Sequence, residues 1–107
     1  MIYEKMRNAW NEADVETYKA LHHEDFSFIF HSTGRVLTSA DIDDQNMKNM
    51  MMAHKNTDER CIYENDDILV QHAVTEFSSG DKEAVMMVSL KKDGLIWRTE
   101  TGATPLK

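Results

Sequence analysis

The stretch EAVMMVSLKKDGLIWRTET, residues 83–101, predicts two long antiparallel strands joined by a two-residue turn at residues 93–94. An Asp-Gly pair between apolar runs is a strong hairpin signal, because a type I′ turn needs positive φ at both central residues. The turn also sets the register of the two strands, so Leu90 is expected opposite Trp97 on one face. The rest of the chain is expected to pack around this hairpin.

Length and composition predict one ordered domain over residues 1–107. The chain has one Pro, four Gly and 41% hydrophobic residues, which is enough for a single core. A formal net charge of -7 disfavours nucleic acid as a partner, since phosphate backbones are bound by clustered Lys and Arg. The lone Cys61 excludes an intrachain disulfide and suits a reducing compartment, so a cytoplasmic location is expected. No apolar run is long enough for a membrane span.

Three helices are predicted in the first half of the chain. The first covers residues 1–13, where apolar residues recur at the spacing of one helix face. Asp14 is expected to cap a second helix that runs to Leu21. Thr38 and Asp41 match a capping box, which predicts that a third helix starts there and continues to His54.

Five strands are expected to follow the helix pair. Three Phe residues alternate with other residues over 26–31, which indicates a strand that ends in a turn. Strands at 57–63, 68–78, 83–92 and 95–103 complete a meander, with the other turns at Asn65-Asp66 and Gly80-Asp81. If every turn has an even number of residues, the face assignment carries from each strand to the next.

This reasoning assigns each strand residue to one of two sheet faces. The face that should carry the helices holds Met86, Val88, Leu90 and a largely buried Trp97, together with Ile62, Gln71, Ala73, Thr75, Phe77, Thr99 and Thr101. The other face holds Cys61, Tyr63, Ile68, Val70, Val74, Val85, Met87 and Ile96, crossed by a polar row of Glu59, His72, Ser89 and Arg98. A monomer rarely leaves such an apolar face exposed, so a homodimer is expected. Its interface is predicted to include Val70, His72, Val74, Met87, Ser89, Ile96 and Arg98.

Three stretches carry a resemblance to a known superfamily: AWNEADVETYKALHHEDF, FSFIFHSTGR and LKKDGLIWRTETGATPL. With the order of elements, they resemble the nuclear transport factor 2-like superfamily, which includes SnoaL-like polyketide cyclases and ketosteroid isomerases. The resemblance implies an α+β fold of the cystatin-like kind, a cone-shaped roll in which three N-terminal helices pack on a curved antiparallel sheet. It further implies an apolar pocket in the concave face and, in many members, a dimer through the outer face.

The resemblance does not carry the isomerase's catalytic residues. That chemistry uses a Tyr on the first helix and two Asp residues in an apolar pocket. Aligning on Asp14, Gly34 and Gly94 places Met6 at the Tyr, Phe30 or His31 at the base, and Met86 at the second Asp. Isomerase activity of this type is therefore not expected.

Other candidate sites have ordinary structural explanations. In the run His22-His23-Glu24-Asp25, consecutive side chains point in different directions, so they are not expected to converge on a metal ion. The run is therefore interpreted as a solvated loop, and no metal site is expected. His31 could act as a general base at a pocket rim, but a surface turn residue is the preferred interpretation. The polar row on the outer face is interpreted as an interface network and not as a hydrolytic set.

The function predicted from the sequence is binding of an apolar small molecule in the concave pocket, without a cofactor. The pocket is expected to be lined by Trp10, Tyr18, Phe28, Phe30, Met47, Met51, Gln71, Thr75, Met86, Trp97 and Thr99. Two alternatives stay open: a non-catalytic dimerisation or association module, and a SnoaL-like cyclase, isomerase or dehydratase. Whether the chain is an enzyme is left open.

Overall fold

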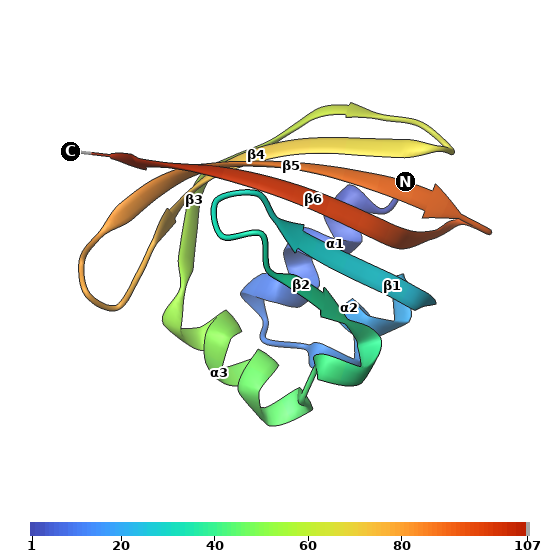
Figure 1. Ribbon diagram of the computed structural model, residues 1–107, viewed down its shortest axis with the longest axis horizontal. Coiled ribbons are helices and arrows are strands. Elements are labelled where there is room, and N and C mark those ends of the chain that lie inside the picture. The colour runs from blue at the N-terminus through green and yellow to red at the C-terminus, as the bar shows by residue number, and fades with distance from the viewer. Residues whose placement is uncertain (107) are drawn as a thin grey trace.

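A computed structural model describes residues 1–106, and Lys107, the last residue of the predicted domain, lies outside the described part (Figure 1). The elements in chain order are α1 Tyr3–Asn11, α2 Val15–Ala20, β1 His22–Phe30, β2 Val36–Thr38, the 3-10 helix η1 Ser39–Asp41, α3 Asp44–Ala53, β3 Lys55–Glu64, β4 Ile68–Glu76, β5 Lys82–Lys92 and β6 Leu95–Leu106.

The six strands form one curved sheet in the order β2-β1-β6-β5-β4-β3. In Figure 1 this sheet lies above and the three α-helices lie below it, so the helices cover one face. The expected α+β class, with three helices on a curved sheet, is confirmed. The sheet is mixed and not wholly antiparallel, because β1 runs parallel to β6.

Local capping signals explain where α2, η1 and α3 begin. The Asp14 carboxylate accepts a hydrogen bond from the Thr17 N–H at 3.1 Å, as expected for the cap of α2. The capping box of Thr38 and Asp41 also forms, but it caps the start of the short η1 and not the start of α3. Ile42 is extended, so the chain breaks there, and α3 starts at Asp44 after a new cap from Asp43.

The main core lies between α1 and the sheet. Ile2, the N-cap of α1, packs with Tyr3 and Met6 of α1 against Phe26, Leu69 and Ile96. Leu69 and Ile96 are 0% exposed. This contact defines the helix side of the sheet, called the inner face below. Strand residues that point away from the helices form the outer face.

The face predicted for β5 is wrong, because the preceding loop has an odd number of residues. β4 ends at Glu76 and β5 begins at Lys82, which leaves the five residues 77–81 between them. Gln71 therefore pairs with Met87 and not with Met86. Since successive residues alternate between faces, Met86, Val88 and Leu90 lie on the outer face, and Met86 is 45% exposed.

A β-bulge at Trp97 then shifts the alternation by one more residue, so the face predicted for most of β6 is correct. The two-residue turn is confirmed, with Lys91 opposite Ile96, but Leu90 pairs with Arg98 and leaves Trp97 as an extra residue. Trp97 follows the buried Ile96, so it points to the outer side and is half-buried, contrary to the expectation of a largely buried ring. After the bulge, Thr99 returns to the inner face as predicted.

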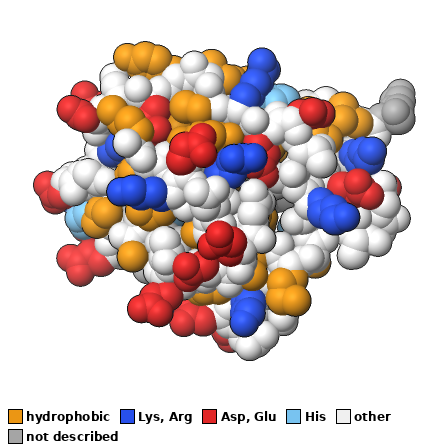
Figure 2. Space-filling model, turned by 180° about the vertical axis from the view of Figure 1, so that it is seen from behind, with side chains coloured by type: hydrophobic (Ala, Val, Ile, Leu, Met, Phe, Trp, Pro, Cys, Tyr) orange, Lys and Arg blue, Asp and Glu red, His pale blue; other side chains and the backbone are white. Residues whose placement is uncertain are grey.

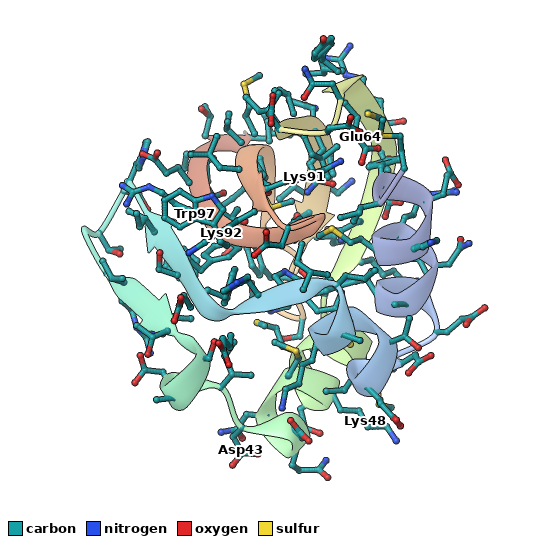
Figure 3. The ribbon with its side chains drawn as sticks, turned by 90° about the vertical axis from the view of Figure 1, so that its right-hand side faces the viewer. Asp43, Lys48, Glu64, Lys91, Lys92 and Trp97 are labelled. Carbon is teal, nitrogen blue, oxygen red and sulfur yellow. The ribbon has the colours of Figure 1, made fainter. Side chains whose placement is uncertain are left out.

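A buried ion pair holds the start of α1 to the sheet. Lys91 Nζ lies 2.6 Å from Glu64 Oε2, and the two side chains are only 4% and 6% exposed. The same carboxylate accepts hydrogen bonds from the backbone N–H groups of Ile2 and Tyr3 at 2.7 and 3.3 Å. Figure 3 shows Glu64 and Lys91 close to the first turn of α1.

Candidate functional site

The inner face carries two central rows of side chains that the sheet register aligns. One row contains Phe28, Leu69, Ser89 and Thr99, and the next contains Phe30, Gln71, Met87 and Thr101. The two Phe rings are half-buried, whereas the neighbouring Ser89 and Thr99 are buried. Aromatic surface therefore stays accessible at the β1 side of the inner face.

Six rings form a continuous aromatic row from α1 through α2 to the end of β1. Its members, in order, are Trp10, Tyr18, His22, Phe26, Phe28 and Phe30. Adjacent ring centroids lie 5.6, 4.8, 4.6, 6.2 and 4.8 Å apart along this order. Spacings of this size are typical of packed aromatic pairs, so the row provides a wall of flat apolar surface.

Burial keeps the two titratable members of the aromatic row neutral near pH 7. It raises the pKa of the Tyr18 hydroxyl to about 12. Burial also lowers the pKa of His22, an effect partly opposed by the hydrogen bond of its ring to the Tyr18 carbonyl oxygen at 2.7 Å. The row therefore presents no charge to a ligand at neutral pH.

Of the three polar residues predicted to line the pocket, two already have partners. Thr99 Oγ1 lies 2.9 Å from Ser89 Oγ, and Thr75 Oγ1 donates to Asn56 Oδ1 at 2.8 Å. Gln71 is 9% exposed, and its side-chain amide forms no hydrogen bond within residues 1–106. Of these three residues, Gln71 is therefore the one whose polar side chain is left without a partner.

The structure places most of the predicted pocket residues on the helix side of the sheet. Phe28, Phe30, Gln71, Thr75 and Thr99 lie on the inner face, and Trp10 and Tyr18 lie on the helices that start the aromatic row. Met51 of α3 is buried and Met47 is half-buried. Met86 and Trp97 lie on the outer side, and Met87 occupies the inner position expected for Met86.

The residues predicted for the dimer interface divide between the two faces. Val70, His72, Val74 and Arg98 lie on the outer face as expected. Met87, Ser89 and Ile96 lie on the inner face, because the odd loop reverses β5 and the bulge follows Ile96. With Ser89 pointing inward, the polar row of Glu59, His72, Ser89 and Arg98 is not formed.

Other candidates behave as ordinary surface or core residues. His31 is exposed and its ring lies 3.0 Å from a Glu100 oxygen. Met6 belongs to the core and Phe30 to the aromatic row, so neither supplies an acid or base. No group of three or more His, Cys, Asp or Glu side chains within residues 1–106 could hold a metal ion.

The sequence interpretation gave no role in the site to several titratable residues of the inner face, among them His22 and Glu83. His22 shares the even spacing of Phe26, Phe28 and Phe30, and this spacing could have revealed it. Glu83 is aligned with Thr75 at the rim, but the wrong face for β5 concealed it. His22 pairs with Ile96 and Glu83 with Pro105, so the two lie roughly 26 to 30 Å apart along β6 at 3.3 Å per residue.

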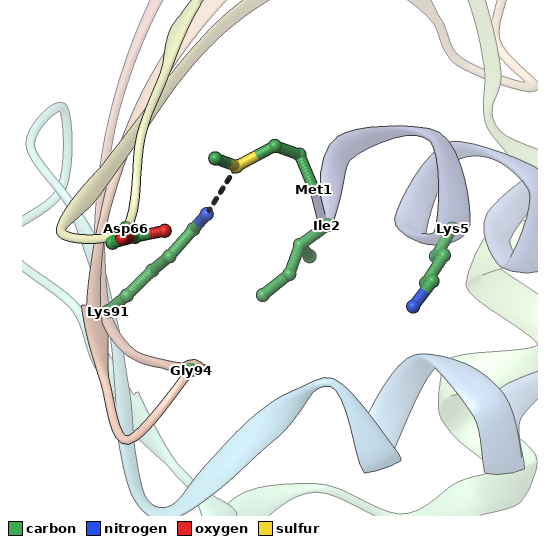
Figure 4. Close-up of a pocket in the computed structure, with 6 residues that line it drawn as sticks. All are labelled: Met1, Ile2, Lys5, Asp66, Lys91 and Gly94. Carbon is green, nitrogen blue, oxygen red and sulfur yellow. Dashed lines mark hydrogen bonds between the residues drawn. The ribbon is translucent and has the colours of Figure 1, made fainter.

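Two open depressions lie at opposite ends of the molecule. One of about 420 Å³ is lined by Met1, Ile2, Lys5, Asp66, Lys91 and Gly94 (Figure 4). The other, of about 490 Å³, is lined by Phe77, Ser79, Asp81, Lys82, Glu83, Pro105 and Leu106. In the first, the Lys91 ammonium is already paired with Glu64; the second adjoins the rim of the inner face.

Comparison with solved structures identifies the fold. No family model matches the chain, and no curated protein matches it. A nuclear transport factor 2-like protein of unknown function from Cytophaga hutchinsonii superposes with a TM-score of 0.74 at 13% identity, over 96% of this chain and 87% of the other. IdmH from Streptomyces antibioticus, a proposed polyketide cyclase, gives a TM-score of 0.70 at 17% identity, over 94% and 88%.

A third similar structure contains a small molecule. It is a hypothetical protein of ketosteroid isomerase-like fold from Catenulispora acidiphila in complex with trimethylamine, with a TM-score of 0.65 at 12% identity, over 94% of this chain and 82% of the other. The chain therefore has the nuclear transport factor 2-like fold, and the resemblance seen in its sequence is confirmed at that level. No helix within residues 1–106 is long and apolar enough to cross a membrane.

Proposed function

We propose that the inner face binds an apolar small molecule, with the aromatic row as one wall and Gln71 as a polar contact. The observation that carries this proposal is the row of six packed rings, which is uncharged at neutral pH and ends at half-buried Phe28 and Phe30. Binding sites for small molecules typically combine such apolar walls with a few polar groups. The trimethylamine complex of a protein with the same fold supports the binding of a small molecule, without bearing on the polarity of that molecule.

Binding fits the inner face better than proton-transfer chemistry. An acid and a base that act on one substrate must both lie within hydrogen-bond reach of it. His22 and Glu83 lie near opposite ends of β6, so they cannot act as such a pair on one small molecule. Glu64 and Lys91, which also lie on the inner face, are buried and paired with each other. A cyclase, isomerase or dehydratase activity is therefore the weaker alternative.

Two adjacent methionines provide the test. Met87 lies on the inner face and Met86 on the outer face, so the same substitution can be compared on both sides of one strand. Titration calorimetry with 2-methoxynaphthalene should show binding that Met87→Gln weakens about fivefold, since a polar group replaces apolar contact surface. Met86→Gln should bind as the unmodified protein does. Absence of binding, or equal effects of the two substitutions, would contradict the proposal.

A second candidate function, association through the outer face, is favoured by the apolar side chains that this face exposes. Met86, Ile62 and Tyr63 are all exposed, and Val70, Val88 and Leu90 lie beside them on β4 and β5. Hydrophobic side chains also gather along the sheet side of the view in Figure 2, among charged ones. Such a surface suits a homodimer, which sedimentation of the purified protein would reveal.

A further inference from the structure

The depression of about 490 Å³ adjoins the inner face at the end where β4 and β5 are joined by their loop. Its lining includes Glu83, which pairs with Thr75 at the rim, and Phe77, two residues further along. Gln71 is 9% exposed and lines neither depression, so a ligand reaches it only if a covering element moves. We propose that the ligand enters from this depression and that α3 is the gate. The inference rests on the proposed function, because it describes how the same site is reached.

One row of small side chains separates this rim from Gln71. The row consists of Ala73, Val85 and Ala103, which pair with one another across β4, β5 and β6. The next row along the inner face contains Gln71, because side chains two residues apart on a strand share a face. Two of the three small side chains are single methyl groups, so this row adds little bulk between the depression and Gln71.

The C-terminal end of α3 lies at the same rim. Its C-cap, His54, leads directly into β3, whose first two residues pair with Glu76 and Thr75. The His54 ring packs nearly perpendicular to the Phe77 ring, with the centroids 4.8 Å apart. Figure 1 shows α3 on the helix side of the sheet, joined to β3. The contact between His54 and Phe77 therefore fastens α3 to a residue that lines the depression.

The remaining interactions of α3 hold it weakly. All ten residues of the helix are described, and Met51 alone is buried, outside the main core between α1 and the sheet. Asp44 pairs with Lys19 of α2 at 2.7 Å, but the two side chains are 69% and 47% exposed, and ion pairs in water contribute little. Segments with few buried side chains open locally, without unfolding of the whole protein.

The chain is anchored on both sides of α3 and extended at both of its ends, as a hinged element requires. Ile42 packs against the main core, and Ser39 Oγ donates to the Glu24 carbonyl oxygen at 2.9 Å, so η1 is fixed to β1. Asp43 and His54, the capping residues of the helix, both have extended backbone conformations. Changes in the backbone angles of these two residues can move α3 while η1 and β3 stay in place.

Hydrogen exchange measures the opening of α3 without a ligand. The hydrogen-bonded amides of α3 should exchange about tenfold faster than those of α1, and with little dependence on urea, because α3 opens locally. His54→Ala should accelerate exchange in α3 about threefold further, the factor expected for the loss of one aromatic contact, and should leave α1 unchanged. Equal exchange rates in α3 and α1 would overturn the gate.

Stopped-flow fluorescence with 2-methoxynaphthalene tests whether α3 controls entry. His54→Ala should raise the association and dissociation rates by the same factor, about threefold, and leave Kd nearly unchanged, since the contact closes both the free and the bound protein. Loss of a residue that contacts the ligand would change mainly the dissociation rate. His31→Ala removes an exposed ring that pairs with Glu100, and as the control it should change neither rate.

The outcomes separate the gate from the function on which it rests. Unchanged rates in His54→Ala, with binding intact, would overturn the gate and leave apolar binding in place. Absence of binding to the unmodified protein would end the proposed function and the gate together.

Discussion

Glu64 joins three distant parts of the chain through one carboxylate. Burial tends to raise the pKa of this group, but the Lys91 ammonium and the N–H groups of Ile2 and Tyr3 outweigh that effect and lower it. A lowered pKa in the folded protein means that the carboxylate stabilises the fold above its ordinary pKa, near 4.3. This stabilisation is lost as the pH falls through the folded-state value.

Lys91→Met should therefore be strongly destabilising. It leaves a buried carboxylate without its cation, which typically costs about 3 to 5 kcal/mol in the free energy of unfolding. Lys92→Met is the matched control, because the Lys92 side chain is 54% exposed and lies 3.9 Å from Asp25 at the surface, where such pairs contribute about 0 to 1 kcal/mol. Urea unfolding at pH 7 would measure both. Equal losses in the free energy of unfolding would show that the buried pair contributes no more than the surface pair.

Trp97 is an insertion in an otherwise regular β5–β6 ladder. Lys91 pairs with Ile96 before it and Leu90 with Arg98 after it, so the bulge adds one residue without moving any other pair. The side chains on both sides of the bulge thus keep their faces. One further residue would break this arrangement, since a one-residue shift moves every following side chain to the opposite face.

Deletion of Trp97 should leave the fold intact, at a cost of about 1 to 3 kcal/mol for the lost contacts. An alanine inserted after Trp97 should be far more damaging, because the buried Thr99 and Thr101 would turn outward. Thermal unfolding followed by circular dichroism compares the two variants. A stable insertion variant beside an unfolded deletion variant would refute this account of the bulge.

Features that depend on residues close together in the sequence could be predicted. Features that depend on whether a loop has an odd or even number of residues, or on one extra residue in a strand, could not. The Asp14 cap and the turn at Asp93-Gly94 are local, and both form as expected. The five-residue loop before β5 and the bulge at Trp97 each shift the alternation of inward and outward side chains by one residue along the sequence, and no short-range pattern specifies either one. The two shifts cancel beyond the bulge, which explains why Thr99 was assigned to the correct face, whereas Met86 on β5 and both Ile96 and Trp97 at the start of β6 were not.

The odd number of residues in the loop before β5 also determines how much of the candidate site could be predicted from the sequence. Gln71 and Phe28 were placed correctly because their strands precede the odd loop. Met86 was chosen in place of Met87 because it follows that loop. His22 was assigned to a solvated loop, since the parallel pairing of β1 with β6 extends the strand to residues that a hairpin-based prediction leaves out.

At the scale of the whole molecule, the sheet presents its two faces to different surroundings. The helices cover the inner face, whereas the outer face exposes apolar side chains on a chain of net charge -7. If two copies associate through this face, their like charges repel, and added salt should strengthen the dimer. Apolar contact must therefore supply the attraction.

Met86→Glu should convert the proposed homodimer into a monomer. The residue is exposed in the single chain, so the substitution should leave folding intact while placing a charge in the centre of the interface. Val36→Glu is the control, since this residue is also exposed but lies on β2 at the far edge of the sheet. Sedimentation velocity at micromolar concentration would measure both. A monomeric unmodified protein would rule out the homodimer under these conditions.

The most direct test of binding at the inner face is a spectrum of isotope-labelled methionine methyl groups, recorded with and without 2-methoxynaphthalene. Met87 and the buried Met51 lie on the helix side of the sheet, whereas Met86 and Met52 are exposed. We predict that the ligand shifts the methyl signals of Met87 and Met51 and leaves those of Met86 and Met52 in place. Shifts confined to Met86 and Met52, or no shifts at all, would contradict the claim that the inner face is the binding site.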